Sequence, residues 1–209
     1  MMVPRVRLAL TILLFAGIGF FVVGTAWKGL RAPWLVDDFP EALAVKVELL
    51  PWLFPLHMIA GGLALVLVPL AFALRRRPRW HRLAGRIAAF DVLLAGLTAF
   101  PVALVAPVTR ISAWGFVAQG TVWLALLGFG IWSIRRRRIA RHRAAMLLMA
   151  ATTSGALFFR IYLALWAIYG DFHYYETFYA FDSWIAWSLP LAGMAIFLKR
   201  TGAFRAVPR

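Results

Sequence analysis

Two basic segments of the sequence each contain a histidine followed directly by an arginine: His81 precedes Arg82, and His142 precedes Arg143. Imidazole nitrogens are common axial ligands of haem iron, and guanidinium groups pair with carboxylates such as the haem propionates. If the helices that carry the two histidines are neighbours, both imidazoles could bind one iron. The pattern therefore predicts a haem b site with His81 and His142 as metal ligands. Its cationic side chains would be Arg82, Arg86 and Arg143.

A second pair of ionisable residues, His57 and Arg160, lies inside long apolar stretches, where a charge is costly and often functional. The helix face of His57 carries small residues, which leave room for a macrocycle or for a closely packed helix. Arg160 could neutralise a haem propionate, a quinone oxygen or a substrate anion. It could also pair with an outer carboxylate such as Asp182, or extend toward the membrane surface. We expect His57 and Arg160 to contribute to a cofactor or ligand site.

Two further residues, Asp91 and His173, have both a structural and a functional interpretation. Asp91 lies inside an apolar stretch near Arg82 and Arg86, so we expect a structural ion pair, with a proton-relay role as the alternative. His173 lies among polar residues between two apolar stretches. We expect it to be solvated, and a metal or second-haem role beside His57 is the alternative.

The apolar stretches that position these residues are long enough to cross a membrane. A hydrocarbon core of about 30 Å requires about 20 apolar residues in a helix. The stretches lack the alternation of apolar and polar residues that a barrel strand requires. The sequence therefore predicts an all-α membrane protein, a single domain over residues 1–209 with about six transmembrane helices. The predicted spans are residues 8–27, 52–74, 87–108, 114–134, 144–169 and 184–198, and residues 28–51 form an outer loop or interfacial helix.

The distribution of basic residues predicts the orientation of these helices. Residues 5–7, 75–86, 135–143 and 199–209 hold 18 of the 23 lysines and arginines, and all four segments fall on one side if the spans alternate. Basic segments favour the cytoplasmic side and attract anionic headgroups. We therefore expect both termini in the cytoplasm, the bacterial inner membrane as the location, and anionic lipid at the cytoplasmic face. The first span has an alternative as a signal peptide, because residues 24–26 resemble a cleavage site.

Composition excludes several other classes of protein. With 63% hydrophobic residues, the chain is too apolar for a soluble domain, and its basic segments are too short and too separated for a nucleic-acid surface. There are no cysteines, so disulfides and iron–sulfur clusters are excluded. The sequence also lacks a phosphate-binding glycine loop, a zinc-binding His-Glu-x-x-His helix and a nucleophile elbow.

Several of these residues resemble a known family. His57 with the following glycines, His81 with Arg82, and His142 with Arg143 are similar to an uncharacterised bacterial family of predicted multi-pass membrane proteins. The likeness covers about residues 52–160. That family is in turn reminiscent of haem-binding membrane cytochromes, including ferric-reductase-like proteins, because histidines lie at the ends of adjacent helices. The resemblance implies a helical membrane fold and favours one haem over two.

Three functions are consistent with these observations. The leading hypothesis is a b-type haem protein that transfers electrons in the membrane, with quinol as a partner. The first alternative is a transporter or small-molecule binding protein whose cavity is lined by His57 and Arg160. The second alternative is a non-catalytic subunit or assembly factor of a membrane complex.

Overall fold

A computed structural model of the chain describes residues 4–31, 34 and 41–202, and within these residues it is helical with no strand. The all-α prediction is therefore confirmed for the described part of the chain. The helices in chain order are α1 (Pro4–Arg31), α2 (Glu41–Leu49), α3 (Leu53–Ala73), η3 (Leu74–Arg76), α4 (Pro78–Leu104), α5 (Arg110–Arg135), α6 (Ile139–Thr153), α7 (Gly155–Tyr169), η4 (Phe172–Tyr174) and α8 (Tyr175–Arg200).

Five helical segments among the described residues are long and apolar enough to cross a membrane. They are Leu53–Arg76, Pro78–Leu104, Arg110–Arg135, Ile139–Tyr169 and Phe172–Arg200. The apolar part of α1, Leu8–Gly24, is shorter than these five. The predicted multi-pass helical architecture is thus present with five candidate spans. The apolar part of α1 is too short to count as a sixth by length and hydropathy.

Three predicted helices differ from those in the structure, and the one predicted at residues 184–198 begins at Tyr175. The helix predicted at residues 87–108 begins nine residues earlier, at Pro78, where proline occupies the first helical turn. Hydropathy missed this start because the first turns of α4 are rich in arginine. The helix predicted at residues 144–169 is divided at Ser154 into α6 and α7. The predicted outer segment 28–51 contains the short helix α2.

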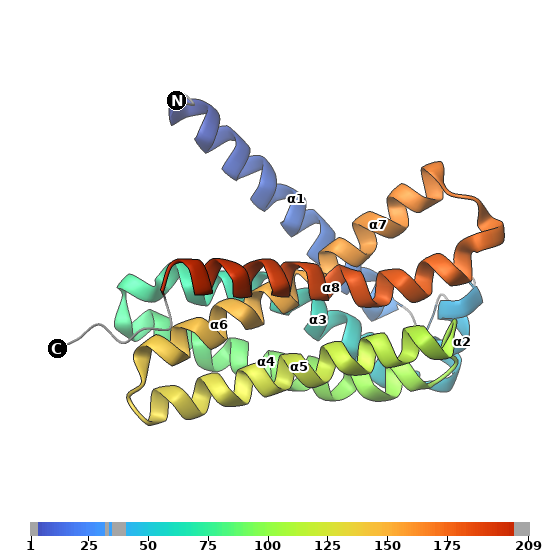
Figure 1. The fold of residues 1–209 in the computed structure, drawn as a ribbon. Helices are drawn as coiled ribbons and strands as arrows, with labels where there is room; N and C mark the ends of the chain where they lie inside the picture. Colours follow the sequence, from blue (N-terminus) through green and yellow to red (C-terminus); the bar gives the residue numbers. More distant parts are fainter. Residues whose placement is uncertain (1–3, 32–33, 35–40, 203–209) are drawn as a thin grey trace.

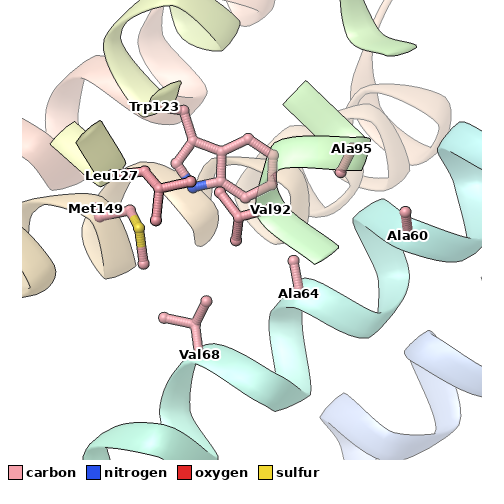
Figure 2. Packing of buried hydrophobic residues seen from close by; sticks show 8 residues of the cluster. All are labelled: Ala60, Ala64, Val68, Val92, Ala95, Trp123, Leu127 and Met149. Carbon is pink, nitrogen blue, oxygen red and sulfur yellow. The ribbon is translucent and has the colours of Figure 1, made fainter. Parts of the chain in front are cut away.

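Four helices, α3 to α6, surround the main hydrophobic core. Along the chain each packs against the next, and α6 also contacts α3, so the four form a closed ring. Trp123 and Leu127 of α5 point toward Val92 of α4, Val68 of α3 and Met149 of α6 (Figure 2). The Trp123 indole also donates a hydrogen bond of 2.9 Å to the Thr153 hydroxyl, which ties α5 to the end of α6.

The remaining helices cover this ring. Helix α8 packs against α5, α6 and α7, and α1 packs against α3. Helix α7 diverges from the direction of α6, and α1 crosses the bundle at a steep angle (Figure 1). The α3–α4 turn, the α5–α6 turn and the end of α8 lie together at one end, which we call the inner end (Figure 1). The α4–α5 turn, α2 and the α7–α8 turn lie at the other end, the outer end. The predicted alternation therefore brings three of the Arg-rich segments to one end of the bundle.

Candidate functional site

His81 lies in the first turn of α4, and its side chain reaches back to the preceding helix. Its Nδ1 is 2.8 Å from the carbonyl oxygen of Ala71 in α3. A carbonyl oxygen can only accept a hydrogen bond, so Nδ1 carries the proton. In the neutral imidazole Nε2 then has a free lone pair, which is the form that binds a metal.

His142 makes the same contact in the next pair of helices. It lies in the first turn of α6, and its Nδ1 is 2.9 Å from the carbonyl oxygen of Gly130 in α5. The imidazole is half-buried, as is that of His81. Both candidate iron ligands therefore have the same tautomer, fixed by the same kind of backbone acceptor.

The two histidines belong to matching helical hairpins. Residues 75–82 and 136–143 share the pattern Arg-Arg-Arg-x-x-x-His-Arg. In each hairpin the histidine is the fourth residue of the second helix and donates to a carbonyl near the end of the first. The sequence shows the repeated pattern, but only the packing of each hairpin reveals the shared hydrogen bond.

The helices that carry the two histidines are opposite members of the ring. Helix α4 packs against α3 and α5, and α6 packs against α5 and α3. The sequence hypothesis required neighbouring helices; in the structure α5 lies between them on one side and α3 on the other. Sites in helical bundles are commonly built from side chains on facing helices, so this arrangement is compatible with a shared ligand.

The arginines assigned to propionates lie at the inner end with exposed side chains: Arg82, Arg86 and Arg143. The expected ion pair between them and Asp91 is absent from the described part of the chain. Asp91 is buried, and its Oδ2 has no hydrogen-bond partner among the described residues. The basic side chains at this end are therefore not neutralised by the nearest carboxylate.

His57 lies in the outer half of α3, with its ring against α4. Its Nδ1 is 3.1 Å from the carbonyl oxygen of Ala95 and 3.2 Å from the hydroxyl of Thr98. The Thr98 hydroxyl itself donates to the carbonyl of Leu94 at 2.8 Å. The expected structural role, a histidine hydrogen-bonded to a partner helix, is present, and it leaves Nε2 of His57 without the proton.

Arg160 lies on α7 with an exposed side chain. Its guanidinium lies over the ring of Phe21 in α1, 5.2 Å from the ring centroid, and donates to its own helix at the carbonyl of Ala156, at 3.0 Å. The expected alternative, an ion pair with Asp182, is not formed among the described residues. Asp182 is fully buried, and neither of its carboxylate oxygens has a described partner. Arg160 instead joins α1 to α7.

Lys46 is a site residue that the sequence reasoning did not identify. It belongs to α2, is buried, and donates to the carbonyls of Val102 at 2.7 Å and Val105 at 2.6 Å. Burial lowers the pKa of its ammonium group below the ordinary value of 10.5. The positive charges of Lys46 and Arg160 both act electrostatically on His57. No hydrogen bond among the described residues joins these three basic side chains, which contact different partners.

His173 does not join this group as a metal ligand. Its side chain is exposed, its ring meets Tyr174 edge-on at 4.8 Å, and its backbone amide donates to Asp171 at 2.9 Å. Among the described residues, no three histidine, cysteine or acidic side chains are grouped so that they could hold a metal ion. This finding concerns sites with three or more ligands, so it does not test a site with only two histidine ligands.

The matched family agrees with the helical architecture. Residues 54–198, more than half of the chain and including α4 to α7, match the family model described as "Predicted membrane protein (DUF2306)". No curated protein and no solved structure matches the chain. The expected likeness to an uncharacterised family of multi-pass membrane proteins is thus confirmed, and the chain belongs to the DUF2306 family, a family of unknown function.

Proposed function

We propose that this membrane protein binds haem b through His81 and His142 and transfers electrons within the membrane, with quinol as a partner. One observation supports the proposal above all others: both imidazoles donate Nδ1–H to a backbone carbonyl. Such a contact holds the ring in place, increases the basicity of the metal-binding nitrogen and leaves Nε2 as that nitrogen. A lone interfacial histidine does not require this arrangement.

The residues around the two histidines are compatible with haem. His81 and His142 occupy equivalent positions in matching hairpins and would be the two residues that hold the haem iron. Arg82, Arg86 and Arg143 are exposed at the same end of the bundle and could pair with the propionates. Bound haem would supply one-electron chemistry at its iron.

The chain itself would supply the ligands and their orientation. The carbonyls of Ala71 and Gly130 hold the Nδ1 protons, so neither ring can rotate without losing a hydrogen bond. The residues next to the histidines on their helices are small and buried: Ala84 on α4, and Ala144 and Ala145 on α6.

Absorption spectroscopy of the detergent-purified protein tests the proposal. Protein made in haem-replete cells is expected to show a Soret band that shifts on reduction with dithionite. His81→Ala and His142→Ala should each lose this band or reduce the bound haem at least tenfold. His173→Ala removes an exposed imidazole and serves as the matched control. Folded wild-type protein without haem would overturn the proposal.

A second candidate function is the binding or transport of a small anion at the outer end. It is favoured by Arg160, whose exposed guanidinium has no carboxylate partner among the described residues, and by the buried ammonium group of Lys46. If this second function is correct, the purified protein should have no visible absorbance. Uptake or binding of an anion should be lost in Arg160→Gln. A subunit or assembly factor would instead co-purify with a larger complex.

A further inference from the structure

A groove of about 420 Å³ lies at the inner end, at the turn between α3 and α4. It is lined by Arg77, Pro78, Arg79, Trp80 and Arg82. All five side chains are exposed, and Trp80 is 58% exposed. The groove lies at the N-terminus of α4, which carries the positive end of the helix dipole. It therefore combines three guanidinium groups, an aromatic ring and a favourable helix end.

The guanidinium groups of this groove have no polar or aromatic partner among the described residues. Arg77, Arg79 and Arg82 make no side-chain hydrogen bond, ion pair or aromatic contact with the described residues. The matching turn between α5 and α6 differs. There Arg136 and Arg138 lie over Trp132, at 5.9 and 5.1 Å from its ring. Arg136 matches its counterpart Arg75, which lies over Phe72 at 4.5 Å, so the two turns differ at Arg138, which lies over a ring where its counterpart Arg77 does not.

An apolar stripe continues from the groove along α4. Leu83, Ile87 and Phe90 follow Arg79 at helical spacing, and their side chains are 51%, 48% and 69% exposed. In a membrane-spanning helix this stripe faces acyl chains. Trp80 lies where interfacial tryptophans are enriched, at the level of the headgroups. A soluble anion would use the arginines alone, whereas a lipid would use the arginines, Trp80 and the stripe.

We propose that this groove is a binding site for one anionic glycerophospholipid. Its phosphate lies between Arg77, Arg79 and Arg82, and an acyl chain follows Leu83, Ile87 and Phe90. The site shares Arg82 with the proposed haem site, whereas Arg77 and Arg79 take no part in haem binding, so variants at Arg77 and Arg79 test the lipid site separately. The corresponding α5–α6 turn lacks two of these free guanidinium groups, because Ala140 stands at the position that matches Arg79 and Arg138, the counterpart of Arg77, lies over Trp132.

Native mass spectrometry in a neutral detergent tests this site with phosphatidylglycerol as the probe. Each basic residue near an anionic surface contributes about 1 kcal/mol, so Arg77→Gln with Arg79→Gln should weaken phosphatidylglycerol binding roughly 30-fold. The matched control is Arg136→Gln with Arg138→Gln, which removes the same charge from the other turn. Its binding should change by no more than about threefold, since Arg136 and Arg138 do not line the groove and exposed charges outside a site are partly screened.

Three results would overturn the proposal. Equal weakening in both double variants would show that net charge alone attracts the lipid. Inorganic phosphate binding as tightly as phosphatidylglycerol, or equal binding of phosphatidylcholine and phosphatidylglycerol, would show that the groove recognises a free anion or any lipid. Leu83→Ser with Ile87→Ser adds a separate arm: it should weaken phosphatidylglycerol and leave any phosphate binding unchanged.

Discussion

At the scale of single residues, the buried Lys46 shows how one side chain can complete a helix end. The last carbonyls of a helix have no partner within it, and the negative end of the helix dipole attracts a cation. Lys46 meets both requirements for α4, because its ammonium group donates to the carbonyls of Val102 and Val105. This contact attaches α2 to the outer end of the bundle.

Replacing Lys46 by methionine keeps the apolar stem and removes the donor. Hydrogen bonds to charged groups contribute about 1.5–3 kcal/mol, and desolvation of the ammonium offsets part of this. We expect Lys46→Met to lower the stability of the detergent-solubilised protein by roughly 1–2 kcal/mol. Thermal unfolding measures the change. Glu48→Gln, which alters an exposed charge on the same helix, is the control and should have little effect.

The same residue predicts a pH dependence. Because burial lowers the pKa of Lys46, the folded protein releases this proton at a lower pH than the unfolded chain, which releases it near 10.5. The unfolded state therefore binds more protons in the window between the two pKa values, and this contribution to stability rises with pH there. Stability of the wild type relative to Lys46→Met should increase as the pH approaches 10.5 from below. A constant difference would contradict the assigned burial.

The sequence shows which residues could bind a ligand, but it does not show which groups those residues contact in the fold. The identities and positions of His81 and His142 indicated metal ligands. Their hydrogen bonds go to backbone carbonyls of Ala71 and Gly130, and any residue provides such a carbonyl. Only the register between two packed helices decides which carbonyl is reached. For the same reason the buried contact of Lys46 could not be read from a segment that looks like an outer loop.

At the scale of helices, the break between α6 and α7 shapes the outer half of the molecule. Ser154 closes α6 by donating from its hydroxyl to the carbonyl of Ala151 at 2.7 Å. Gln119 donates to the carbonyl of Thr152 at 3.3 Å, so a polar group of α5 supports the break. The next residue, Gly155, is buried directly against α8. Hydropathy could not predict this break, because Ile139–Tyr169 contains no proline and is apolar enough on average to be taken as a single span.

Gly155 is expected to be essential for this packing. A Cβ at this position would lie 2.6 Å from the Cβ of Trp187 and 2.9 Å from its Cα, so the backbone of α8 would have to move. Overpacking of this kind costs about 1–3 kcal/mol, and we expect Gly155→Ala to destabilise the protein by that amount. Unfolding in detergent measures it. Gly128→Ala is the control, since a Cβ added at that position of α5 would have no neighbouring atom within 4 Å among the described residues. Equal stability of the two variants would contradict the close contact.

At the scale of the whole molecule, the sequence predicted the class of fold, a helical membrane protein, better than it predicted the number and arrangement of the helices. Apolar length and the positions of arginines were sufficient to predict membrane-crossing helices with three Arg-rich segments at one end. They were not sufficient for the number of spans, because α1 is helical over Pro4–Arg31 while its apolar part covers only Leu8–Gly24. They also could not show that α4 and α6 face one another across a ring, which depends on how four helices close around Trp123 and Leu127.

The proposed function depends on the two halves of the ring acting together, with one histidine from each hairpin on the same iron. Electron paramagnetic resonance of the oxidised, detergent-purified protein tests this claim most directly. Two imidazole ligands predict a low-spin ferric signal in the wild type, and the loss of either ligand, in His81→Ala or His142→Ala, should convert it to a high-spin signal or abolish it. A low-spin signal that persists unchanged in both variants, or folded protein with no haem signal, would contradict the account.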